Sequence, residues 1–201
     1  MRAIVTLPGL SPEALAALKQ WLGITTPADD VPLSALLRMA LEACENFTSI
    51  VPLVGAYEEL LPLRTLANQM ASYGDFGTAP YRYSTDWQVL KTRPVQAIIA
   101  VSGIMADGTR FALPSSAYET VLDADGAGFV RVIDPGMATR FVVRFTAGLA
   151  TDWGGLPEAL RQGIIRLAAH QHRTRESDGA APLPPASVAA LWRPWRRLRI
   201  I

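Results

Sequence analysis

The sequence has very little cysteine and no long apolar run. Its single cysteine, Cys44, excludes a disulfide within the chain and any zinc site built from several thiolates. No stretch of about 18 consecutive apolar residues is present to cross a membrane. The first residues also lack the apolar core of a signal peptide. We therefore expect a protein that is made in the cytoplasm and has no membrane partner.

The sequence also lacks the short motifs of common enzyme sites. It contains no G-x-S-x-G, no P-loop and no G-x-G-x-x-G. Cys44 lies on the apolar face of a predicted helix, where burial disfavours a reactive thiolate. His170 and His172 are two residues apart, so on a helix they point about 200° away from each other and do not grip one metal ion. We predict no catalytic, cofactor-binding or metal-binding residue and no enzymatic activity.

One segment partly matches a calcium-binding loop. Position 5 of that loop is Ala127 and position 9 is Arg131, neither of which suits the ion, and strands are predicted on both sides. A hairpin turn is therefore favoured over a metal site. The matching positions 1, 3, 6 and 12 are Asp123, Asp125, Gly128 and Asp134.

The sequence does have a large apolar content and an uneven distribution of charge. Half of its 201 residues are hydrophobic, which is enough for a buried core, and the net charge is only +1. Residues 1–60 carry three basic and seven acidic side chains, whereas residues 151–201 carry eight basic and four acidic ones. This asymmetry favours a subunit that meets different partners at its two ends.

Helical patterns occur near both ends of the chain. Ser11 is a typical N-cap for a helix over residues 11–22, and Asp29-Asp30 is predicted to cap a second helix with Cys44 in its core. A long helix is predicted from Pro157 to about Glu176. A hydrophilic, proline-rich linker, Ser177–Pro185, then precedes a final short helix.

The middle of the chain has the patterns of strands and turns. Residues 50–86 show no clear period, although Tyr57–Met70 could hold a short helix. A small antiparallel meander is predicted after them. Its strands are Val95–Val101, Arg110–Leu113, Ala117–Leu122, Phe129–Ile133 and Arg140–Phe145.

These patterns divide the chain into four parts. We predict an N-terminal helical part (1–49), an irregular insertion (50–86), an antiparallel β part (87–150), and C-terminal helices with a basic docking tail (151–201). Together they predict an α+β fold.

The order of the motifs resembles the phage head-tail connector family, particularly its long members from prophages and gene transfer agents. The matching blocks cover about two-thirds of the chain, and residues 50–86 match least. The blocks are Leu10–Leu22, Asp29-Asp30, Leu36–Thr48, Arg93–Ile98, Arg140–Gly148, Leu156–Ile164 and Leu191–Arg196.

The resemblance implies a fold and an assembly. The fold is a single connector domain in which a helical bundle, formed by the N- and C-terminal helices, carries a small inserted antiparallel β-sheet region. The assembly is a ring of twelve copies under the portal protein, which passes DNA through its channel without reading its sequence. A stopper or tail-terminator protein follows downstream. The location is the head-tail neck of a particle assembled in the bacterial cytoplasm.

The C-terminal tail is rich in arginine and tryptophan, the side chains most enriched at interface hot spots. We predict that it docks on the portal rather than forming part of the core, so that removing it after Pro185 leaves a folded subunit. A terminal helix that packs its tryptophans on the bundle is the other interpretation. The predicted docking residues are Trp192, Arg193, Trp195, Arg196, Arg197 and Arg199.

Two other functions remain open from the sequence. The basic tail is compatible with a small nucleic-acid-binding protein, for which salt-sensitive DNA binding would be the sign. A hydrolase of unfamiliar type could draw on Asp123, Asp134 and the two histidines, and loss of activity on their substitution would reveal it.

Overall fold

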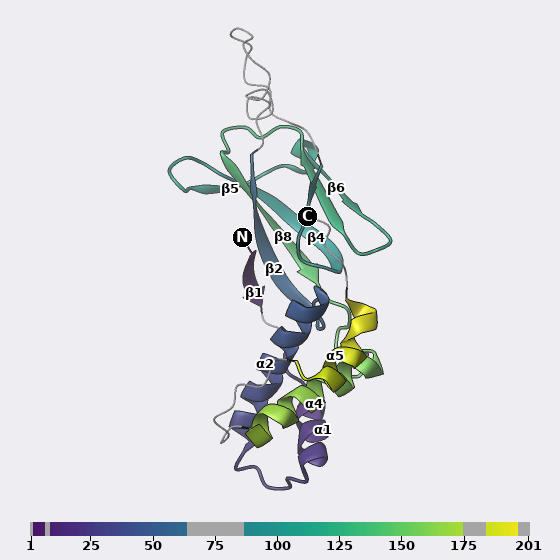
Figure 1. Ribbon diagram of the computed structural model, residues 1–201. Helices are drawn as coiled ribbons and strands as arrows, with labels where there is room; N and C mark the ends of the chain where they lie inside the picture. Colours follow the sequence, from purple (N-terminus) through teal and green to yellow (C-terminus); the bar gives the residue numbers. More distant parts are fainter. Residues whose placement is uncertain (1, 7–8, 64–86, 175–183, 197–201) are drawn as a thin grey trace. The chain divides into compact units, whose positions relative to one another are not determined.

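The computed structural model describes residues 2–6, 9–63, 87–174 and 184–196 (Figure 1). The chain divides into two compact units. Unit 1 contains Met1–Thr6 and Ala56–Thr146, and unit 2 contains Leu7–Gly55 and Ala147–Ile201. Each unit is therefore built from two separate stretches of the chain.

Unit 1 contains two β-sheets (Figure 1). The larger has the strand order β1-β2-β8-β4-β5 and the smaller the order β3-β7-β6. The pairs β1–β2, β4–β5, β3–β7 and β6–β7 are antiparallel. The strands are β1 (Arg2–Thr6), β2 (Gly55–Pro62), β3 (Gln88–Val89), β4 (Val95–Ile104), β5 (Arg110–Ala112), β6 (Tyr118–Leu122), β7 (Gly128–Val132) and β8 (Arg140–Ala147).

The predicted fold class is wrong. The strands form sheets of five and three strands instead of a small region inserted into a helical bundle. The larger sheet includes β1, which precedes all the described helices. The five strands predicted between residues 95 and 145 are present, but the meander is also wrong. β8 lies between β2 and β4, and β7 pairs with β3 as well as β6.

β2 is a strand where the sequence suggested the start of a helix. Its residues alternate between buried and partly exposed, and Gly55, Tyr57, Glu59 and Leu61 occupy the buried positions. Two of these four are not apolar, so hydrophobicity alone does not reveal the period of two residues. Residues 64–70 of the suggested helix lie outside the described residues.

Glu59 is buried because the backbone of a neighbouring loop satisfies its carboxylate. Oε2 accepts a hydrogen bond from the Lys91 backbone N–H at 2.9 Å. Oε1 accepts from the Thr92 backbone N–H at 2.8 Å and from the Thr92 hydroxyl. This carboxylate fixes the loop between β3 and β4 to β2, and the charge is tolerated because several donors surround it.

Unit 2 contains four described helices that share one apolar core. Ser11 caps the first as predicted, because its Oγ accepts a hydrogen bond from the Ala14 backbone N–H. Asp29 occupies the cap position of the second without a side-chain cap bond. No described helix is both long enough and apolar enough to cross a membrane. The helices are α1 (Pro12–Leu22), α2 (Asp30–Thr48), α4 (Glu158–Thr174) and α5 (Ala186–Trp192).

Cys44 lies in this core, as the sequence predicted. Its side chain is completely buried on α2, and burial raises the pKa of its thiol to about 12 despite a hydrogen bond with Thr48. A thiol with this pKa is protonated at neutral pH, which makes it a poor nucleophile.

We predict that the buried thiol makes stability fall at high pH. The folded-state pKa of Cys44 is above its ordinary value of 9.0, so the unfolded chain loses the proton first as pH rises. The stabilisation that the protonated Cys44 thiol contributes is complete below about pH 9 and is lost between about pH 9 and about pH 12. Urea unfolding measured across this range should show a steeper decline for the natural chain than for Cys44→Ala. Parallel curves would contradict the assignment.

We also predict that Glu59→Gln lowers the free energy of unfolding by about 1–3 kcal/mol, because the amide cannot accept from all of the donors around it. Glu58→Gln is the matched control on the same strand. Glu58 pairs with the exposed Arg110 at 3.0 Å, and losing such a pair costs only about 0–1 kcal/mol. Chemical denaturation of both variants is the measurement, and equal losses would show that Glu59 does not fix the loop.

Candidate interface

The predicted docking segment ends the described part of unit 2. Its described residues are Trp192 at the end of α5 (Ala186–Trp192), a single 3-10 turn, η2 (Arg193–Trp195), and Arg196. Pro194 lies inside this turn, where its ring prevents α5 from continuing as a regular α-helix. Most of the linker predicted over Ser177–Pro185 lies outside the described residues.

Trp192 fills a gap between two other helices of unit 2. It is completely buried, and its ring centroid lies 5.9 Å from that of Phe47 on α2, with the ring planes tilted by 51°. On α4, a Cβ added to Gly163 would come within 2.0 Å of Trp192 Nε1. The indole therefore occupies the space that a side chain at Gly163 would need.

This position corrects the expectation that Trp192 is available for docking. The residue belongs to the hydrophobic core of unit 2. Removing everything after Pro185 would expose that core, so the truncated subunit is not expected to keep its melting temperature. Composition misled the prediction, because tryptophan is enriched both at interfaces and in cores.

The other predicted docking residues have different surroundings. Arg193 and Arg196 are exposed, whereas Trp195 is half-buried against the core of unit 2. The Arg196 guanidinium carbon lies 5.5 Å from the centroid of the Phe47 ring. Arg197 and Arg199 lie outside the described residues. The described segment thus presents two cations beside a partly exposed indole.

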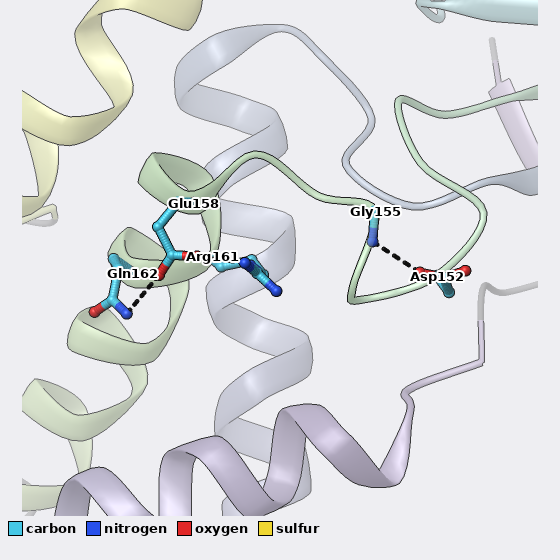
Figure 2. Close-up of polar contacts among 5 residues, drawn as sticks. All are labelled: Asp152, Gly155, Glu158, Arg161 and Gln162. Atoms are coloured by element: carbon cyan, nitrogen blue, oxygen red, sulfur yellow. Dashed lines mark hydrogen bonds and ion pairs between the residues drawn. The ribbon is translucent and has the colours of Figure 1, made fainter.

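A group of polar contacts lies just before α4 and in its first turn (Figure 2). The Asp152 carboxylate accepts a hydrogen bond from the Gly155 backbone N–H at 2.8 Å. Glu158, in the first turn of α4, accepts from Gln162 Nε2 at 2.9 Å and pairs with Arg161. The hydrogen bond from Gln162, followed by that from Arg161, lowers the pKa of Glu158. These hydrogen bonds fix the turn before α4 and the side chains of its first turn.

The structure places the aspartates and histidines that were considered for other chemistry in turns and on α4. Asp123 accepts a hydrogen bond from the Ala127 backbone N–H at 2.6 Å, within the turn that joins β6 and β7. Asp134 accepts from the Gly136 backbone N–H at 3.0 Å. His170 and His172 are half-buried on α4. Among the described residues, no three His, Cys, Asp or Glu side chains are placed to hold a metal ion.

Comparison with known proteins gives one kind of match. The sequence matches no protein-family profile and no curated protein. The fold is similar to that of a chain in the neck of a native gene transfer agent (GTA) particle, a structure computed with C12 symmetry, at 25% identity and a TM-score of 0.72. The similarity covers 100% of this chain and 97% of that one.

Two further solved structures are similar over the same shares of both chains. One is the neck of an empty GTA particle, a structure computed with C6 symmetry, at 24% identity and a TM-score of 0.74. The other is the virion of a native GTA particle, at 24% identity and a TM-score of 0.71. The whole chain thus has the fold of chains found in GTA particles.

We predict that Gly163→Ala destabilises the protein although alanine is the better helix former. In an exposed helix this change stabilises by about 1 kcal/mol, but here the new methyl group would overlap the buried indole. In a Trp192→Ala background the overlap is absent, so Gly163→Ala should stabilise. Urea unfolding of the single and double variants gives the free energies of a double-mutant cycle. If Gly163→Ala changes the free energy of unfolding in the same direction in both backgrounds, the proposed packing is wrong.

Proposed function

We propose that this chain is a structural subunit of the neck of a gene transfer agent or a related tailed-phage-type particle. The observation that carries the proposal is the fold that this chain shares with chains from GTA necks, along almost the full length of the two chains compared. The predicted location in a particle neck agrees with these neighbours. The role is structural, and it requires no cofactor.

Within the neck, we assign the chain to the head-tail adaptor. In this role it forms a ring under the portal, continues the DNA channel, and offers a surface to a stopper or tail-terminator protein. The order of the sequence blocks supports this assignment. The symmetries of the similar necks support a ring of twelve, because such a ring has sixfold as well as twelvefold symmetry.

The contact with the portal is assigned to the end of the chain. Arg193 and Arg196 are exposed and would meet carboxylates, while the half-buried Trp195 adds apolar contact. Trp192 supports the segment from inside unit 2 and does not touch the partner. Arg197 and Arg199, beyond the described residues, extend the same positive charge in the sequence.

We predict that particle-producing cells without this chain assemble DNA-filled heads that lack tails. The natural chain should restore tailed particles, whereas the double variant Arg193→Glu and Arg196→Glu should not, because its charges repel the portal carboxylates. Arg173→Glu changes another exposed arginine of unit 2 and is the matched control. Electron microscopy of the necks is the measurement.

Two outcomes would contradict this function in different ways. Normal tailed particles without the chain would show that it is not a neck component. Full rescue by the double variant would retain the neck role but refute the portal contact. Equal melting temperatures of the three purified proteins exclude misfolding as the cause.

A further inference from the structure

Two surfaces of unit 1 keep apolar side chains exposed. The first is the β1 edge, which we define as the outer edge of Arg2–Thr6 at one end of the five-stranded sheet. All five residues are exposed, and Ile4 and Val5 retain 49% and 42% of their accessible surface. The register with β2 shifts after Ile4. Apolar edge strands of this kind are prone to pair with other chains unless they are covered.

The second surface is the outer face of the three-stranded sheet. Val89 pairs with Phe129, which pairs in turn with Val121, so the three side chains form a row across one face. Val130 and Val132 point to the opposite face and are buried. We define the outer face as this row together with Trp87.

Charged groups on the outer face are already paired. Arg131 pairs with Glu119 across β7 and β6, and its guanidinium carbon lies 5.0 Å from the centroid of the Trp87 ring. A partner could therefore cover this face without leaving a lone buried charge. Trp87 is 39% exposed and Val121 is 47% exposed, which leaves apolar area available for contact.

Ring symmetry indicates what covers the two surfaces. Copies related by a rotation around a ring meet head to tail, so each copy needs two different and complementary surfaces. Unit 1 has two different apolar surfaces, one at the β1 edge of the larger sheet and one on the smaller sheet. In the view of Figure 1, β1 lies to the left of β2 and β6 lies to the right of β4. A twofold dimer would instead require one self-complementary surface.

We propose that the β1 edge of one subunit packs against the outer face of a second copy of this chain in the ring. The inference rests on the proposed neck function and adds the surface through which neighbouring subunits touch. Ile4 contacts the row of Val89, Phe129 and Val121. Each subunit thereby uses one surface on each side, and the contact repeats until the ring closes.

Engineered cysteines test this contact in particles. The double variant Ile4→Cys and Val121→Cys, oxidised in purified particles, should give a ladder of disulfide-linked dimers, trimers and larger species on a denaturing gel without reductant. The ladder extends because each subunit links to two neighbours. Cys44 does not interfere, since it is completely buried.

The matched control is Ile4→Cys with Met137→Cys. Met137 is 74% exposed but lies outside both surfaces, so this pair should remain monomeric on the gel. Ladders from both variants would indicate unspecific collision and overturn the proposal. A product that stops at the dimer, or a link to another particle protein, would overturn it as well.

An antibody against the chain separates failure of the contact from failure of the neck function. If particles contain the chain but the test pair gives no ladder, the contact is wrong and the neck function stands. If particles lack the natural chain, the neck function fails and the contact fails with it. If only the double variant is absent from particles, Ile4→Ser with Val121→Ser decides whether these positions are needed for assembly. Normal incorporation of this second variant would overturn the proposal.

Discussion

The buried indole of Trp192 fixes α5 to the other helices of unit 2. This unit is made from two stretches of chain, and the indole joins them because it touches Phe47 on α2 and Gly163 on α4. α4 also contacts α1, α2 and α5, so its position depends on every other described helix of the unit. Without the indole, α5 would lose the side chain that fixes it, and the exposed cations that follow would lose their support.

A corresponding role in unit 1 belongs to Glu59. The carboxylate is surrounded by the donors of Lys91 and Thr92, so the loop before β4 is fixed to β2. Glu59 specifies one arrangement of its loop, because other arrangements would leave its buried charge without donors. Trp192 acts by shape, because its ring fills the space above Gly163. The two units are therefore stabilised by different chemistry.

Sequence patterns predicted elements better than architecture. The helix ends at Ser11 and Gly23 follow local rules, as do the strands between residues 95 and 145, because turn residues and spacing act over a few positions. β2 was missed because Glu59 interrupts its apolar alternation. The order of strands depends on long-range pairing, which no local pattern encodes. For the same reason the sequence did not predict that β1 pairs with β2 at the edge of the larger sheet. Composition led to the prediction that the C-terminal tail docks on a partner, but it did not show that Trp192 is buried.

Several reactive side chains of the described residues have structural roles. Asp123 and Asp134 accept hydrogen bonds within turns, and the Cys44 thiol is buried with a raised pKa. Carboxylates used in this way define the shape of loops. The exposed side chains include apolar residues on the strands of unit 1 and arginines on the helices of unit 2. A neck subunit needs such surfaces, because its neighbours recognise it by packing and charge, and so the resemblance in fold and the placement of these side chains support the same role.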